Sequence, residues 1–174
     1  MRLFPIVVSL LAAVSAPAVA ALPVGAMAPD FTADGALGGK PFALHLKEQL
    51  RHGPVVLYFF PKAFTDGCTF EAKAFSDASA DFRKAGARVI GMSGDPVPLL
   101  QKFSTEACRS KFPVASATPA VIQSYDVAIP GNPAMSGRTS YVIDRSGKIT
   151  LVYSNRDYKD HVAQTLAAVR TLKR

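Results

Sequence analysis

The sequence VVLYFFPKAFTDGC, residues 55–68, determines how this chain is expected to fold. Its first part, residues 55–60, is a continuous apolar run rich in β-branched and aromatic residues, with a proline on each side. Such a run is typical of a central strand that is buried on both faces. The segment therefore predicts a buried strand that leads, through a short loop beginning at Pro61, to Cys68.

The residues after Cys68 follow a helical period. Apolar side chains recur at steps of three and four residues and predict one helix whose buried face contains Phe70, Ala74, Phe75, Ala78 and Phe82. Gly86 is expected to end this helix. A thiol in its first turn lies among unpaired backbone N–H groups at the positive end of the helix dipole, and both favour the thiolate. Cys68 is therefore a candidate nucleophile, and the alternative is an inert, half-buried thiol.

Strands and helices alternate along the rest of the chain. Upstream, residues 42–46 alternate like a half-buried strand, whereas residues 21–40 are predicted to be irregular. Downstream we expect a strand at 88–93 and then a helix that is capped by Asp95 and runs from Pro96 to Ala107. A short strand near Val114 and a helical turn at 121–122 follow. The chain is expected to end with two strands at 140–143 and 148–153, which a turn joins, and with an amphipathic helix over 162–172. This order predicts an α/β thioredoxin-like sandwich, with a central mixed sheet and helices on both faces.

The first twenty residues have the features of a signal peptide. Arg2 gives a positive start, residues 3–14 are almost wholly apolar, and Ala18-Val19-Ala20 offers the small-x-small pattern of a cleavage site. The apolar run is too short to span a bilayer comfortably. We therefore expect a signal peptide at residues 1–20 and one domain at 21–174 that is exported without stable membrane insertion, to the periplasm if the source is Gram-negative and otherwise secreted. The alternative is a buried N-terminal helix or strand.

The composition argues against several classes of protein. With 174 residues, 49% of them hydrophobic, the chain suits one globular domain. Its formal charge of +7 is spread along the sequence without a run of like charges, so we expect no nucleic-acid binding. The sequence has no cluster of metal-ligating residues and no haem or nucleotide motif, so no metal or other cofactor is expected.

The two cysteines, Cys68 and Cys108, leave several functions open. An exported protein would normally pair them, so one interpretation is a non-catalytic thioredoxin-fold protein with a structural disulfide. A disulfide oxidoreductase is disfavoured because no Cys-x-x-Cys surrounds Cys68. A cysteine hydrolase would need a histidine base, but His45, His52 and His161 lack a supporting pattern. We interpret each of these as a surface histidine or an internally satisfied one.

The region around Cys68 resembles the active site of the peroxiredoxins. Residues 55–77, VVLYFFPKAFTDGCTFEAKAFSD, contain the family pattern Pro-x-x-x-Thr-x-x-Cys and are most similar to the bacterioferritin-comigratory, or peroxiredoxin Q, branch. The resemblance continues in residues 24–31, VGAMAPDF, and in residues 138–144, RTSYVID, so it spans nearly the whole predicted domain. It implies a thiol peroxidase that reduces hydrogen peroxide and organic hydroperoxides.

The resemblance also implies a role for each of five residues. Cys68 matches the peroxidatic cysteine, which attacks the peroxide and becomes a sulfenic acid. Thr65 would hydrogen-bond the peroxide and the sulfur, and Pro61 would shield the pocket from water. Arg138 would hold the thiolate and stabilise charge on the breaking O–O bond, and Glu71, one helical turn after Cys68, would orient the arginine. Each of these four neighbours also has a plainer interpretation when it is taken singly. Thr65 would only start the helix and Pro61 would only form a turn, whereas Arg138 would be a surface charge and Glu71 a first-turn acid.

The sequence departs from the commonest pattern of this branch at Lys73, where many relatives carry a resolving cysteine. Some members resolve instead through a cysteine on the helix that is predicted here to hold Cys108. That arrangement implies an intramolecular Cys68–Cys108 disulfide, formed after local unwinding. The alternatives are a core role for Cys108 and a one-cysteine cycle. Either cycle implies a thioredoxin-like or small-thiol reductant outside the cytosol, and the branch favours a monomer.

Overall fold

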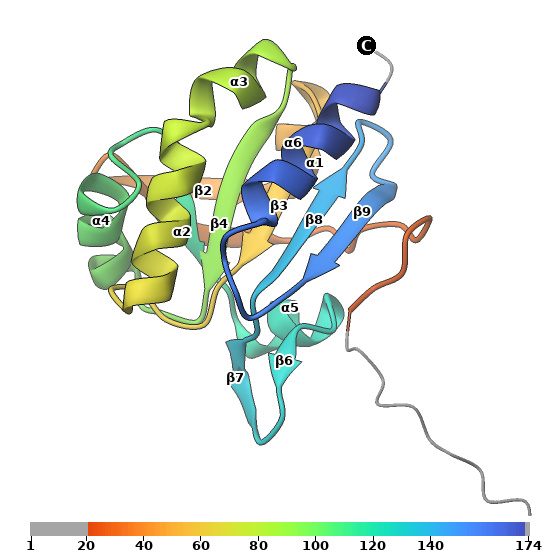
Figure 1. The fold of residues 1–174 in the computed structure, drawn as a ribbon. Helices are drawn as coiled ribbons and strands as arrows, with labels where there is room; N and C mark the ends of the chain where they lie inside the picture. The colour runs from red at the N-terminus through yellow and green to blue at the C-terminus, as the bar shows by residue number, and fades with distance from the viewer. Residues whose placement is uncertain (1–20, 173–174) are drawn as a thin grey trace, which may run out of the picture.

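Strand β3 (Val55–Phe59) forms the centre of the fold, as its apolar sequence predicts. The computed structural model describes residues 21–172, so the predicted signal peptide at residues 1–20 lies outside the described residues (Figure 1). Every β3 side chain is buried, and successive side chains point to opposite faces of the sheet. Val56 and Tyr58 therefore enter one hydrophobic core, whereas Leu57 and its alternating neighbours enter another.

The main sheet has seven strands in the order β2-β1-β5-β4-β3-β8-β9. At its centre, β3 pairs in parallel with β4 (Arg88–Ser93), which pairs in parallel with β5 (Val114–Ser116). The antiparallel strands at the edges are β1 (Thr32–Leu37), β2 (Lys40–His45), β8 (Thr139–Ile143) and β9 (Ile149–Ser154). A second, two-stranded sheet joins β6 (Ala128–Ile129) to β7 (Asn132–Ser136). The main sheet is therefore mixed, as predicted.

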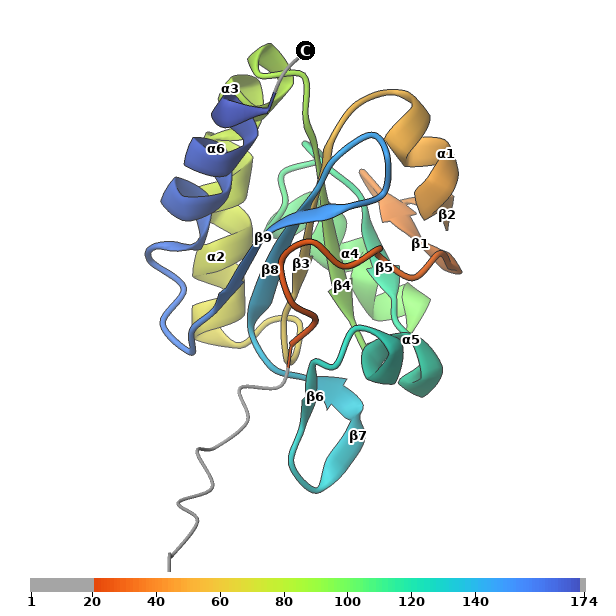
Figure 2. The same ribbon diagram turned by 90° about the vertical axis from the view of Figure 1, so that its right-hand side faces the viewer.

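Helices cover both faces of the main sheet. Figure 2 shows α2 (Asp66–Asp77), α3 (Ser79–Lys84) and α6 (His161–Thr171) on one face, and α1 (Leu46–Arg51) and α5 (Pro119–Ser124) on the other. The core under α2, which we call the α2-side core, also receives Leu100 and Phe103 from α4 (Val97–Glu106). This arrangement confirms the predicted α/β sandwich. No helix within residues 21–172 is long and apolar enough to cross a membrane.

The segment predicted to be irregular, residues 21–40, contains strand β1. Its small residues give little β signal, and this prediction is wrong at residues 32–37. The strand forms through pairing with β2 and β5, and at Gly35 a Cβ atom would clash with the carbonyl oxygen of Val114. The backbone of β5 thus packs so closely against β1 that the strand needs a glycine at this position.

The single helix predicted over Phe70 to Phe82 is two helices. A break at Ala78 separates α2 from α3, so Phe82 belongs to α3. Phe75 and Phe82 are buried as predicted, but Phe70 is 51% exposed and stacks on the ring of Tyr158. The prediction for Phe70 is therefore wrong, because the apolar ring has a partner on the surface instead of in the core.

Two predictions about α4 are also wrong. Asp95 does not cap it, because the N-cap residue is Pro96 and no side chain bonds the first turn. The Asp95 carboxylate instead accepts a hydrogen bond from the backbone N–H of Ala63. The two residues meet because Ala63 follows β3 and Asp95 follows β4, and the carboxyl ends of these parallel neighbours lie at the same edge of the sheet. Cys108 lies two residues beyond the last residue of α4, not on the helix. Directly after Cys108, Arg109 and Ser110 have positive φ angles of 49° and 57°, so the chain there is not helical.

Candidate active site

Cys68 is the third residue of α2, and the loop before it begins where β3 ends. The N-cap residue is Thr65, whose carbonyl oxygen accepts a hydrogen bond from the N–H of Thr69 at 2.8 Å. The Cys68 side chain is only 2% exposed and belongs to the α2-side core. The first N–H groups of a helix have no intrahelical partner, so a sulfur in this turn lies in a positive electrostatic potential. The position therefore favours a thiolate.

The guanidinium group of Arg138 connects Cys68 to Glu71. Its Nη2 donates to the Sγ atom of Cys68 at 3.4 Å, and its Nη1 donates to Oε2 of Glu71 in a close ion pair. Its Nε donates to the carbonyl oxygen of Arg156 at 3.1 Å. Because each nitrogen has its own partner, the plane of the guanidinium is fixed and one edge of it faces the sulfur.

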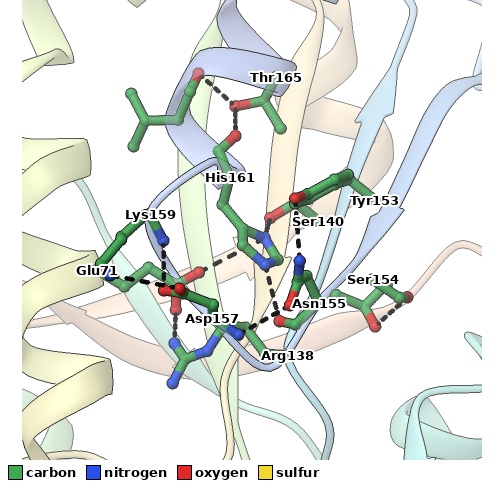
Figure 3. A network of polar contacts seen from close by, with 12 residues as sticks. Glu71, Arg138, Ser140, Tyr153, Ser154, Asn155, Asp157, Lys159, His161 and Thr165 are labelled. Carbon is green, nitrogen blue, oxygen red and sulfur yellow. Dashed lines mark hydrogen bonds and ion pairs between the residues drawn. The ribbon is translucent and has the colours of Figure 1, made fainter.

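Glu71 is a fully buried carboxyl group on α2 (Figure 3). Burial raises its pKa to about 8, although Arg138 acts in the opposite direction. The raised pKa means that desolvation of the carboxylate outweighs the attraction of the guanidinium. Glu71 is therefore a buried acid whose charged form is disfavoured by burial and favoured by its contact with Arg138.

Pro61 and Thr65 lie in the loop before α2, beside the thiol but without a described contact to it. Pro61 is half-buried and directly follows the last residue of the apolar run that forms β3. The Thr65 side chain is exposed, and its hydroxyl donates to the carbonyl oxygen of Lys62 at 3.0 Å. The structure thus brings Cys68, Glu71 and Arg138 into contact, and it places the other two predicted residues next to them along the loop.

Three residues that the sequence analysis did not select give this loop its shape. Asp95 accepts from the N–H of Ala63 at 2.6 Å, and its position at the end of the neighbouring parallel strand was the available signal. Phe64 has a φ angle of 63°, which is unusual for a bulky residue, and its ring packs edge-on against Phe103. A Cβ atom at Gly67 would lie 3.1 Å from Nη2 of Arg138, so the glycine leaves room for the guanidinium.

Cys108 is a free thiol that is fully buried in the α2-side core. Burial raises its pKa far above that of an ordinary thiol, so it is neutral in this position. Its carbonyl oxygen accepts a hydrogen bond from the hydroxyl of Ser76 at 3.0 Å. Ser76 follows Cys68 by eight residues on α2, which corresponds to about 12 Å along the helix axis. A bond between the two sulfurs therefore requires the Cys108 segment to move.

A surface hollow of about 460 Å³ lies away from this site. It is lined by residues of α3 and β4 and by Phe112, and it does not include Cys68, Glu71 or Arg138. No group of three or more His, Cys, Asp and Glu residues within residues 21–172 is arranged to hold a metal ion. The candidate site, as far as its contacts show, consists of the thiol, Arg138 and Glu71.

Comparisons with known proteins identify the family of this chain. The sequence pattern of the AhpC/TSA family matches residues 24–152. The chloroplastic peroxiredoxin Q of Suaeda salsa is 35% identical over 155 residues, which cover 88% of this chain and 71% of that protein. The chloroplastic peroxiredoxin Q of Arabidopsis thaliana is 37% identical over 145 residues, which cover 82% and 64%. The crystal structure of peroxidoxin BcpB from Mycobacterium tuberculosis has a TM-score of 0.77 at 33% identity and covers 87% of this chain and 98% of its own. The chain belongs to the AhpC/TSA family and is a peroxiredoxin related to the Q branch, with the thioredoxin-like fold of that family.

Proposed function

We propose that this peroxiredoxin is a thiol peroxidase in which Cys68 is the peroxidatic nucleophile and Arg138 its activating cation. The observation that carries the proposal is the 3.4 Å contact between Nη2 of Arg138 and Sγ of Cys68 in the first turn of α2. Membership of the family supports peroxide reduction as the reaction. A cation beside a thiol at a helix N-terminus supports the same chemistry, because both stabilise the thiolate.

The proposed first step is attack of the Cys68 thiolate on the terminal oxygen of hydrogen peroxide or an organic hydroperoxide. An S–O bond forms and the O–O bond breaks, so the sulfur is oxidised to a sulfenic acid and the peroxide is reduced. The leaving hydroxide or alkoxide takes a proton from solvent and departs as water or an alcohol. Arg138 stabilises the negative charge as it passes from sulfur to the leaving oxygen. Thr65 would turn its hydroxyl from Lys62 to the peroxide, and Pro61 would limit the access of water.

We further propose that Cys108 resolves the sulfenic acid. Its thiol attacks the Cys68 sulfur, a disulfide forms and water leaves, and a thioredoxin-like or small-thiol reductant then restores both thiols. This step requires local unwinding after α4, where Arg109 and Ser110 hold left-handed φ values that L-amino acids disfavour. Strain of this kind beside Cys108 lowers the free energy needed to open the segment. Lys73, where many relatives carry their resolving cysteine, is exposed and has no thiol.

Mass spectrometry after one equivalent of hydrogen peroxide, in the presence of dimedone, tests both steps. We expect the reduced wild-type chain to form a Cys68–Cys108 disulfide. The Cys108→Ser variant should stop at a dimedone adduct of Cys68 and should complete one turnover, but a thioredoxin-like dithiol should not recycle it. Lys73→Ser serves as the control that keeps both thiols.

The outcomes separate the alternatives. Normal cycling by the Cys108→Ser variant would mean that an external thiol acts directly on the sulfenic acid in a one-cysteine cycle. A disulfide that is present before peroxide is added, with no adduct at any stage, would mean that the cysteines are structural.

We also propose that residues 1–20 are a signal peptide and that the enzyme acts in the periplasm of a Gram-negative source or is secreted. The support is the apolar run at residues 3–14 followed by Ala18-Val19-Ala20. We expect protein from the extracytoplasmic fraction of the source organism to begin near Ala21 when it is sequenced from its N-terminus. Full-length chains retained in the cytosol would contradict export.

A further inference from the structure

The segment that carries Cys108 is bonded to the end of α2. The hydroxyl of Ser76 donates to the carbonyl oxygen of Cys108 at 3.0 Å, and Nη1 of Arg109 donates to Oδ1 of Asp77 at 2.5 Å. Ser76 and Asp77 are the last two residues of α2, and each bond joins positions that are 32 residues apart in the sequence. We call these two bonds the α2 latch. The peroxidase reaction described above assigns no role to either residue of α2.

The backbone of residues 107–111 does not favour its own conformation. In the backbone hydrogen bonds of this segment, the N–H groups donate to carbonyl oxygens of α4 or of the segment itself. Arg109 and Ser110 hold left-handed φ angles of 49° and 57°, which L-amino acids disfavour. A strained segment stays in place only when its surroundings hold it. The burial of Cys108 and the α2 latch therefore stabilise this conformation.

The latch holds Cys108 at the end of α2 that is farther from Cys68. Cys68 is the third residue of the helix, and Ser76 follows it by eight residues, which is about 12 Å along the axis. A disulfide requires its two Cα atoms to lie within about 7 Å of each other. The bonds with α2 therefore oppose the movement by which Cys108 would reach the Cys68 sulfur. Burial also raises the pKa of the Cys108 thiol, so it is a poor nucleophile until the segment opens.

The two bonds of the latch differ in strength. Ser76 is buried, so its hydrogen bond is shielded from water. The side chains of Arg109 and Asp77 are 44% and 61% exposed. Exposed ion pairs contribute little to stability, because water and salt screen their charges. We therefore expect Ser76 to provide the larger part of the resistance to opening and Asp77 the smaller part.

The sulfenic acid of Cys68 has two competing fates in the proposed cycle. In one, the Cys108 thiol attacks the Cys68 sulfur, an S–S bond forms and water leaves. In the other, a second hydroperoxide transfers an oxygen atom to the sulfur, which becomes a sulfinic acid, and the peroxide is reduced to water or an alcohol. The first fate requires the Cys108 segment to open, whereas the second does not. A tighter latch therefore prolongs the sulfenic acid and increases the share of enzyme that is overoxidised.

We propose that Ser76 and Asp77 are positioning residues that hold Cys108 away from Cys68, and that the strength of this α2 latch sets the lifetime of the Cys68 sulfenic acid. The inference rests on the proposed thiol peroxidase function and deepens it, because it assigns the control of the resolving step to the last two residues of α2.

Alkylation of Cys108 tests the latch without peroxide. In a Cys68→Ser background Cys108 is the remaining thiol, and it is fully buried, so iodoacetamide reaches it when the segment opens. We expect Ser76→Ala to raise the alkylation rate about fivefold, which corresponds to the loss of one hydrogen bond, and Asp77→Asn to raise it about twofold. The rate should depend only weakly on urea below the unfolding transition, because a local opening exposes little surface.

Each latch variant has a matched control. Ser136→Ala removes another buried hydrogen bond of 3.0 Å from a serine to a carbonyl oxygen, that of Phe60. Glu48→Gln removes an exposed acid that pairs with Arg51. We expect both controls to leave the alkylation rate of Cys108 unchanged.

Two results would overturn the latch. The first is an unchanged alkylation rate in both latch variants, and the second is an equal rise in the matched controls, which would indicate a general loss of stability. If Ser76→Ala does not fold, the exposed position 77 keeps the test available. Asp77→Lys sets a like charge against Arg109 and should raise the rate about threefold.

A second measurement uses the chain with both cysteines and increasing hydrogen peroxide. We expect Ser76→Ala to form the Cys68–Cys108 disulfide about fivefold faster, and to need about fivefold more peroxide before half of Cys68 is sulfinic acid by mass spectrometry. Faster alkylation without either change would mean that another step limits resolution, which overturns the control of the sulfenic acid by the latch. A chain that forms neither sulfenic acid nor disulfide would contradict the proposed function, whereas the alkylation result would stand by itself.

Discussion

The Cys68→Ser variant is expected to consume no hydrogen peroxide beyond the rate of a protein-free solution. A serine hydroxyl at this position is not ionised near neutral pH and cannot accept oxygen as sulfur does. The fold should survive, because serine is smaller by less than a methyl group and offers Nη2 of Arg138 an oxygen acceptor in place of Sγ. We expect the free energy of unfolding to change by about 1 kcal/mol. Peroxide loss and thermal unfolding measured on the same sample check both statements.

The informative control is Cys108→Ser, which keeps the nucleophile and should consume one equivalent of peroxide in the absence of reductant. If the Cys68→Ser variant still consumed peroxide and the Cys108→Ser variant did not, the roles of the two thiols would be reversed. If neither substitution changed peroxide loss, the thiol mechanism would be wrong.

Replacing Arg138 with lysine is expected to lower the second-order rate constant with hydrogen peroxide by about 10²- to 10³-fold. The guanidinium contacts Sγ of Cys68, Oε2 of Glu71 and the carbonyl oxygen of Arg156 at once. An ammonium group is a single point charge without the planar fork and cannot reproduce the three contacts together. The loss therefore exceeds what the unchanged formal charge suggests. Competition for peroxide with a haem peroxidase measures the rate constant directly.

A matched control for this variant is Arg145→Lys, because Arg145 is exposed and donates to the carbonyl oxygen of Arg51 at the end of α1. Thermal unfolding should accompany both measurements, since weakening a buried ion pair is destabilising. Protonation of Glu71, whose pKa is already raised to about 8, limits that cost. An Arg138→Lys rate within about threefold of wild type would show that the bidentate geometry is not needed.

The parts of this molecule that were predicted correctly have local causes. Six consecutive apolar residues predict β3, and the three-to-four period after Cys68 predicts a helix that begins close to the thiol. Arg138 is a different case, because it lies 70 residues from Cys68 and no periodicity connects them. Only the resemblance of residues 138–144 to a known motif selected it, and its contact with Sγ agrees with that expectation.

The features that the sequence analysis missed depend on partners that are distant in the sequence. Strand β1 pairs with β2 along its length and with the distant β5 at Gly35 and Ala36, and Asp95 binds the loop after β3 instead of its own helix. The β6–β7 hairpin contains prolines, which weaken any strand signal. His161 was expected to be a surface histidine or an internally satisfied one, and only the fold shows that it is buried with Ser140 and Asn155 as its hydrogen-bond partners. In each case the sequence shows the residue type, but it does not show the distant neighbour that determines the contacts of that residue.

The location of both thiols in one hydrophobic core has a consequence for redox energetics. A Cys68–Cys108 crosslink would require the segment after α4 to leave its packing and its hydrogen bond to Ser76. The oxidised protein would then be less stable than the reduced one, and by thermodynamic linkage its disulfide would have a higher reduction potential than an unstrained one. Refolding of the core would thus help to drive electron transfer from the reductant, so the potential of this couple would be set by packing as much as by the sulfur chemistry itself.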